Sequence, residues 1–168
     1  MNYSHRKNHQ SGVVLVISLI MLLLLTIIGV TSMQVNGLEE KMAGNSRDKN
    51  IAFQAAESTL KEAEIYILNN PTDVATYSGA NGLLGIADDE PTNFFTHGWS
   101  GNDSATTPNG YGGSFDLVED PRYIIKKVSI TAATATDPRK TYFKITARAT
   151  GATAGTQIIL QEYFVRDN

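Results

Sequence analysis

The hydrophobic side chains of this chain are concentrated in one uninterrupted block near its start. Residues Val13–Met33 contain no charge and no proline, and sixteen of these twenty-one residues are apolar. About 20 helical residues are enough to cross the hydrocarbon core of a bilayer. A short polar leader with two cations, Arg6 and Lys7, precedes the block and ends at Gly12. This pattern predicts a membrane-spanning helix that begins directly after a basic leader.

The charges on either side of the block indicate its orientation. Arg6 and Lys7 precede it, whereas Glu39 and Glu40 follow it. Because cationic flanks stay on the cytoplasmic side, we expect the leader in the cytoplasm and the rest of the chain outside the membrane. The block is longer than the apolar core of a cleavable secretory signal, which has about 7–15 residues. Two interpretations stay open on this feature alone: cleavage after Gly12 that leaves the helix as an anchor, or an uncleaved anchor.

Hydroxyl side chains interrupt the block at Ser18, Thr26, Thr31 and Ser32, and Gly29 lies among them. Serine and threonine in a helix commonly bond to the carbonyl one turn back. Small residues also allow two helices to approach closely. The signal for close helix packing is weak here, so we favour hydroxyls bonded to their own helix.

A second helical pattern follows in residues 34–70, and it is amphipathic. Its apolar residues recur at steps of three and four, which places them on one face. They are Phe53, Ala56, Leu60, Ala63 and Ile67. Glu57 and Lys61 form a favourable i,i+4 pair, and Pro71 stops the helix because the residue before a proline is displaced from helical geometry. We expect this half of the helix to dock on a soluble domain.

The remaining residues divide into an irregular region and a β region. Residues 71–122 are rich in Gly, Asn, Thr, Asp and Pro and have little periodicity. Three segments beyond them are rich in β-branched and aromatic residues, which is typical of strands. They are Tyr123–Thr131, Thr141–Ala149 and Gln157–Val165. The predicted fold is α+β, with a long N-terminal helix packed on a C-terminal antiparallel sheet of three to four strands.

Composition narrows the chemistry of the chain. It has 168 residues, no cysteine, three histidines and a formal net charge of -3. The absence of a basic region argues against direct nucleic-acid binding. Two acidic runs, Asp88-Asp89-Glu90 and Asn102-Asp103-Ser104, lack the ligand spacing of a calcium loop and are interpreted as solvated loops. Trp99 is interpreted as filling a small core. We therefore expect no catalytic, cofactor or metal site.

Several segments of the sequence are similar to the PilX-type minor pilins, which are type IV pilus assembly proteins. The N-terminal similarity covers about 50 residues, and shorter segments near the C-terminus add to it. The segments are GVVLVISLIMLLLLTIIGVTSMQ, LEEKMAGNSRDKNIAFQAAESTLKEAE, PRYIIKKV, KITARATG and IILQEY. The resemblance implies a type IV pilin-like fold. It also implies a structural subunit rather than an enzyme.

The resemblance also implies how the chain is divided and processed. In pilins, a prepilin peptidase cuts after the leader glycine and methylates the new N-terminus. Here this implies cleavage between Gly12 and Val13, with Val13 N-methylated. The implied parts are a prepilin leader (1–12), a transmembrane and pilus-core helix (13–33), an amphipathic helix (34–70) and a globular head (71–168, with irregular residues 71–122 and strands within 123–165).

One residue departs from the usual pilin pattern. Most pilins carry a glutamate at the fifth position after the cleavage site, where it pairs with the N-terminal amine of the subunit ahead. That position is Ile17 here. Because a buried charge needs a partner, a subunit with nothing ahead of it has no use for the glutamate. Ile17 therefore favours a position at the tip of the fibre.

The resemblance implies a minor pilin that primes pilus assembly and supports adhesion, twitching motility or DNA uptake from a tip complex. Its implied partners are other minor pilins, the major pilin, the prepilin peptidase, a large tip adhesin and the inner membrane before assembly. Two alternatives stay open. One is a minor pseudopilin of a type II secretion system, and the other is a membrane-anchored periplasmic binding module.

Overall fold

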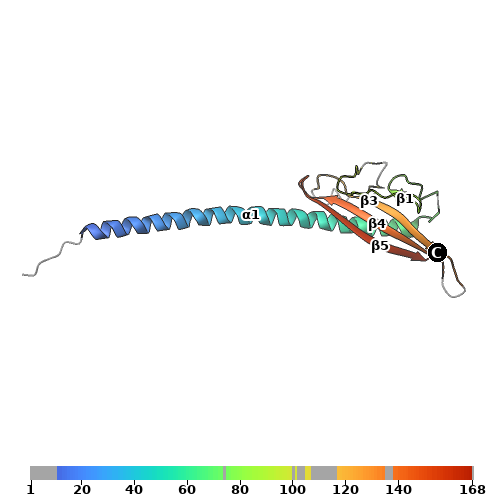
Figure 1. Cartoon of the computed structure of the whole chain (residues 1–168), viewed down its shortest axis with the longest axis horizontal. Helices are drawn as coiled ribbons and strands as arrows, with labels where there is room; N and C mark the ends of the chain where they lie inside the picture. The colour runs from blue at the N-terminus through green and yellow to red at the C-terminus, as the bar shows by residue number, and fades with distance from the viewer. Residues whose placement is uncertain are drawn as a thin grey trace, which may run out of the picture. The chain divides into compact units, whose positions relative to one another are not determined.

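The structure is a computed structural model that describes residues 11–73, 75–99, 101, 105–106, 117–134 and 138–167. These residues form two units, within 1–44 and 45–168, each considered by itself. One helix and five strands are present in the described ranges (Figure 1). They are α1 (Ser11–Asn69), β1 (Leu83–Leu84), β2 (Ala105–Thr106), β3 (Arg122–Thr131), β4 (Lys140–Thr150) and β5 (Gln157–Asp167).

Helix α1 contains both helical patterns of the sequence. It ends at Asn69, as predicted from Pro71. Gly29, Gly37 and Gly44 all lie within it. At its C-terminal end, the backbone N and the side-chain Nδ2 of Asn70 both donate to the carbonyl of Tyr66, at 3.0 and 2.9 Å. Pro71 follows directly. These bonds satisfy a carbonyl of the last turn, which has no partner within the helix.

The three predicted long strands are confirmed as an antiparallel meander. Strand β4 is central, and it pairs with β3 on one side and β5 on the other. The register places Ile145 opposite Ile125 and Phe143 opposite Phe164. Both ends of each strand lie within two residues of the predicted bounds. The enrichment of these segments in β-branched and aromatic residues was therefore sufficient to find them.

The sheet as a whole is mixed rather than purely antiparallel. Strand β1 pairs in parallel with β3 through Leu83 opposite Ile125, and β2 pairs antiparallel with the same strand. Asn81 and Gly82 have positive φ angles of 54° and 72°, a conformation that glycine and asparagine tolerate best. This turn directs Leu83 onto the edge of β3. A two-residue strand carries no periodicity, which explains why the sequence did not reveal it.

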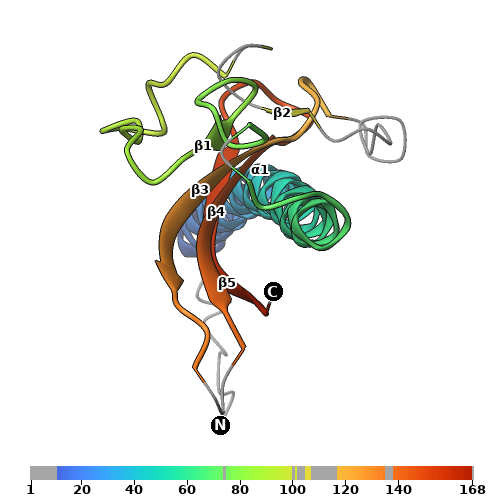
Figure 2. The same cartoon turned by 90° about the vertical axis from the view of Figure 1, so that its right-hand side faces the viewer.

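The second half of α1, from Asn45 onward, covers one face of the sheet (Figure 2). Its sheet-facing residues are mostly small and fully buried. They are Ala52, Ala55, Ala56, Thr59, Leu60, Ala63 and Ile67. The prediction that Phe53 shares this face is wrong, since 40% of Phe53 is exposed. The alanines of this face bring the helix backbone close to the sheet. The larger ring of Phe53 lies at the side of the helix, where it is partly exposed.

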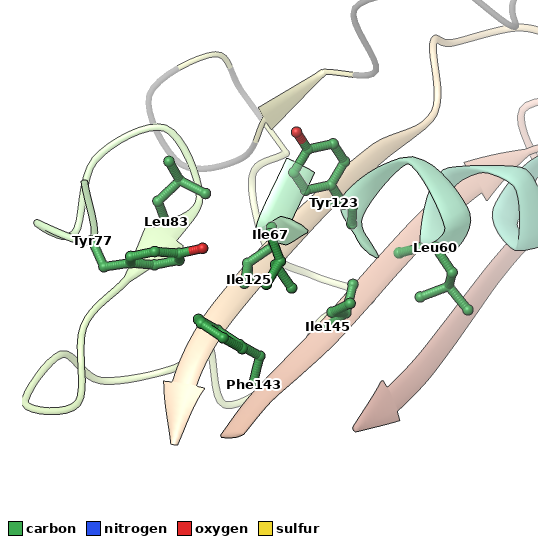
Figure 3. Packing of buried hydrophobic residues seen from close by; sticks show 10 residues of the cluster. Leu60, Ile67, Tyr77, Leu83, Tyr123, Ile125, Phe143 and Ile145 are labelled. Atoms are coloured by element: carbon green, nitrogen blue, oxygen red, sulfur yellow. The ribbon is translucent and has the colours of Figure 1, made fainter. Parts of the chain in front are cut away.

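The largest buried side chains meet where the end of α1 crosses the sheet (Figure 3). Ile67 from the helix, Ile125 from β3 and Phe143 from β4 are fully buried. The ring of Tyr77 lies 5.4 Å from the ring of Phe143. Burial, reinforced by the neighbouring Tyr66, raises the pKa of Tyr123 in the same core to about 12. The core is thus closed by the helix on one side and by residues 77–83 on another.

The other face of the sheet is partly covered by residues 85–99. The ammonium of Lys126 donates to the carbonyls of Gly85, Ile86 and Asp88. Lys144 forms an ion pair with Glu90 at 2.7 Å. These cationic side chains extend from β3 and β4, so the loop is attached to those two strands.

Trp99 lies over the same strands. Its Nε1 donates to the carbonyl of Phe94 at 2.8 Å, and its ring lies 5.9 Å from the guanidinium of Arg148. The indole is half-buried between these groups. Trp99 therefore packs against Phe94 and Arg148 on this face and is not part of the buried hydrophobic clusters.

Candidate functional site

The first candidate site is the surface of the apolar helix in the first unit. Its large apolar side chains from Val13 to Met33 are between 49% and 78% exposed. The most apolar window of 18 residues has a mean hydropathy of 3.2. An apolar surface this extensive is not found on soluble monomers. It requires either lipid or other apolar helices around it.

The residues singled out by the sequence lie together at the start of this helix. Gly12 and Val13 are in the first turn of α1, which begins at Ser11. Ile17 is one turn further and shares a face with Val13. Their side chains are 59% and 52% exposed. The leader residues 1–10 lie outside the described residues.

The hydroxyl groups in the apolar helix bond to their own backbone, as favoured from the sequence. Ser18 Oγ donates to the carbonyl of Leu15 at 2.8 Å, and Thr26 Oγ1 donates to that of Leu23 at 2.7 Å. Thr31 Oγ1 does the same toward the preceding turn. The hydroxyl protons of Ser18, Thr26 and Thr31 are therefore satisfied by the helix itself, which matters in apolar surroundings, where an unsatisfied donor would be costly.

A polar clasp, formed by Asp48 and the β4–β5 turn, fixes α1 to the sheet near the start of the second unit. The carboxylate of Asp48 accepts hydrogen bonds from Ala152 N at 2.6 Å and from Thr153 Oγ1 at 2.5 Å. Gly151 lies so close that a Cβ there would collide with the carboxylate. Hydrogen bonds from Thr153 and Thr156 hold the pKa of Asp48 below its ordinary value of 3.8. The clasp therefore works with an ionised aspartate.

A second attachment holds the C-terminal end of α1. Arg166 Nη1, from β5, donates to the carbonyls of Ile67 and Asn70, the latter at 2.5 Å. These carbonyls belong to the helix end, where the macrodipole favours a cation. Asp48 thus ties one end of the second half of α1 to the β4–β5 turn, and Arg166 ties the other end to β5.

The acidic run Asp88-Asp89-Glu90 has structural roles. Asp88 Oδ2 accepts the backbone N–H of Gly85 at 2.7 Å, and Glu90 pairs with Lys144. The run Asn102-Asp103-Ser104 lies outside the described residues. Within the described ranges no group of three or more His, Cys, Asp or Glu residues could hold a metal ion.

The sequence did not reveal Asp48, Arg166 or Glu162 as important positions. Asp48 stands in a polar stretch, and its partners are more than 100 residues away. The weak signal for its clasp was Gly151, since a glycine between two strands often marks a close backbone approach. Glu162 alternates correctly for a strand, but its environment depends on which helix residues lie opposite it.

Comparison with known protein families identifies the family of the chain. The model of the PilX N-terminal family matches residues 11–61. The model of the family described as type IV pilus assembly protein PilX, C-terminal part, matches residues 69–166. The chain belongs to the PilX family. Comparison with curated proteins and with solved structures gave no match.

Membership of the PilX family gives the apolar helix its context. This PilX-family chain is a minor pilin of type IV pilus assembly, and its family consists of structural pilus components. The N-terminal match covers most of α1, and the C-terminal match covers the sheet. The exposed apolar residues of α1 are suited to anchoring the protein in a membrane and to packing in a pilus.

Proposed function

We propose that this PilX-family protein is processed between Gly12 and Val13 and then uses one helix twice. Residues 13–33 first anchor it in the inner membrane, with the leader in the cytoplasm and the sheet unit in the periplasm. The same residues then pack against the helices of other minor pilins and of the major pilin. The protein primes assembly from a tip complex and supports adhesion, twitching motility or DNA uptake.

The observation that carries this proposal is the exposed apolar surface of α1. Every large apolar side chain in residues 13–33 is about half exposed or more. Lipid covers such a surface before assembly, and neighbouring helices cover it in a fibre. The hydroxyls that bond to their own backbone allow the helix to move between these two environments without losing a polar partner.

The tip position is supported by Ile17. A glutamate here would need the N-terminal amine of a subunit ahead of it, and a carboxylate without a partner is expensive in an apolar bundle. An isoleucine packs equally well with or without such a subunit. A protein that begins a fibre has no subunit ahead, so the apolar side chain suits it.

The experiment that tests processing is intact-mass and N-terminal analysis of the protein from cells with an active prepilin peptidase. The expected product begins at Val13 and carries one added methyl group. A peptidase-deficient strain serves as the control and should retain the leader. A Met1 start in both strains would contradict the proposal.

Recovery of the protein in sheared surface fibres tests assembly separately. A minor pilin is expected in the fibre fraction at low abundance and only when the assembly ATPase is active. A membrane-anchored binding module would remain in the membrane fraction under both conditions, and that result would refute a role in the fibre.

A further inference from the structure

Strand β5 forms an edge of the sheet that is unpaired among the described residues. It is eleven residues long and pairs with β4 on one side, and no described residue pairs with its other side. Natural sheets protect such an edge with a proline, a bulge, a very short strand or inward-pointing charged residues. Strand β5 has the charged residues Glu162 and Arg166, and Arg166 is engaged by the end of α1. Strand β5 contains no proline, and its register with β4 is continuous from Gln157 to Asp167. Its outer N–H and C=O groups are therefore available to another strand.

The core is incompletely closed along this strand. The sheet-inward residues Phe143, Ile145 and Ala147 of the neighbouring β4 are fully buried. On β5, the residues that point the same way remain partly exposed, although Leu160 and Phe164 pack against the core. One more strand beside β5 would complete their burial.

The opposite face of β5 carries two exposed apolar side chains among polar ones. Tyr163 is 74% exposed and Val165 is 45% exposed. The loop of residues 85–99 is attached to β3 and β4 through Lys126 and Lys144. Strand β5 therefore presents a free main-chain edge next to apolar side chains, which is the arrangement used in recognition by strand addition.

A groove of about 510 Å³ runs between α1 and β5. Its lining residues are Gln54, Glu57, Ser58, Leu60, Lys61 and Glu162. Side chains of a strand added beside β5 would alternate between this groove and the face that carries Tyr163. The groove therefore determines which residues such a strand needs on one of its sides.

The charges in this α1–β5 groove favour a cation. Lys61 is engaged by Glu64 at 2.8 Å, and Glu57 and Glu162 face the groove. Among the described residues, the buried Oε1 of Glu162 has no hydrogen-bond partner. Burial and the nearby carboxylate of Glu64 both raise the pKa of Glu162. Lys61 also interacts with Glu57 and Glu162, so one ammonium is shared among the carboxylates of Glu57, Glu64 and Glu162.

We propose that β5 accepts an extended strand from another pilus protein, which continues the sheet and places a lysine or arginine in the α1–β5 groove beside Glu162. Main-chain bonds along β5 supply the affinity. The alternating pattern, basic toward the groove and apolar or aromatic toward Tyr163, supplies the specificity. The choice of a pilus protein as the donor rests on the function proposed above.

The test uses the full chain in detergent micelles and three fluorescent peptides as long as β5. The first alternates lysine with tyrosine and valine, the second has glutamate in place of lysine, and the third is the first with a central proline. The first should bind and slow hydrogen exchange of β5 amides. The acidic and proline peptides should bind about tenfold more weakly, because each loses a charge-assisted contact or a main-chain bond.

Two matched variants locate the contact. Glu162→Gln keeps the shape of the side chain and should weaken binding of the lysine peptide by roughly three- to tenfold. Asp89→Asn removes an exposed charge on the loop outside the groove and should leave binding unchanged. Equal binding of the three peptides, or protection outside β5, would overturn the proposal.

Self-association of the full chain through β5 would also overturn it, because the occupant would then be a second copy rather than a basic strand. Leader processing and fibre recovery do not depend on these peptides. A failure of strand addition is therefore distinguishable from a failure of the proposed pilus function.

Discussion

The small residues of α1 allow the helix to lie close to the sheet, and Ala56→Leu tests this directly. Ala56 is fully buried and packs with Ala55 and Ala149, beside the half-buried Ile158 and Leu160. An isobutyl group in place of its methyl group has no space between helix and strand. Overpacking of this kind destabilises a domain by about 1–3 kcal/mol. For a unit of this size, the melting temperature should fall by roughly 3–15 °C.

The assay is thermal unfolding of the full chain in detergent micelles, followed by near-ultraviolet circular dichroism. This signal reports the tertiary environment of aromatic residues such as Tyr77, Tyr123 and Trp99, all of which lie in the second unit. The matched control is Ala43→Leu, which makes the same change on the same helix at an exposed position. The two changes have equal effects on intrinsic helix propensity.

The expected result is a lower melting temperature for Ala56→Leu and an unchanged one for Ala43→Leu. Equal melting temperatures for the two variants would refute the reasoning, because Ala56 would then tolerate a larger side chain. A destabilised sheet unit should also reduce the amount of protein recovered in sheared fibres.

Three further substitutions test separate parts of the molecule. Ile17→Glu should lower recovery of the protein in fibres, whereas Ile17→Leu should not, because a carboxylate at this position has no cationic partner at a tip. Asp48→Asn should lower the melting temperature at pH 7. The difference should vanish as the pH falls through the depressed native pKa of Asp48, because the wild-type carboxylate is then protonated. Glu162→Gln should raise the melting temperature at pH 7. This gain should shrink as the pH falls below the raised native pKa of Glu162, where the wild-type carboxyl is also neutral.

For each of these three predictions, one outcome would contradict the reasoning behind it. Greater incorporation of Ile17→Glu along the fibre shaft would place the subunit behind another one. A pH-independent loss in Asp48→Asn would mean that the charge of Asp48 does not matter to the clasp. A lower melting temperature of Glu162→Gln at pH 7 would mean that Glu162 is stabilised by a cation.

The local pattern of the sequence was enough to find the main elements. A continuous apolar block, apolar steps of three and four, and segments rich in β-branched and aromatic residues each reflect the local preferences of a single helix or strand. The end of α1 before Pro71 and the bounds of β3, β4 and β5 could be predicted for this reason. The PilX resemblance came from the same segments.

The burial and pairing of side chains that depend on distant partners could not be predicted from the local sequence pattern. Phe53 satisfies the helical step as well as Ala56 does, but only the approach of the sheet decides which one is buried. Lys61 was expected to pair with Glu57, whereas the structure pairs it with Glu64 on the side that faces β5.

The sequence by itself determined the apolar helix, the position of Gly12 and Ile17 within it, and the three long strands, because these features depend on neighbours along the chain. Only the tertiary structure decided that Asp48 and Arg166 tie the helix to the sheet. It also decided that β5 lies at the edge of the sheet beside the α1–β5 groove, with no strand paired to its outer side among the described residues. Those features depend on residues about 100 positions apart. Contacts at such separations leave no periodic trace in either segment.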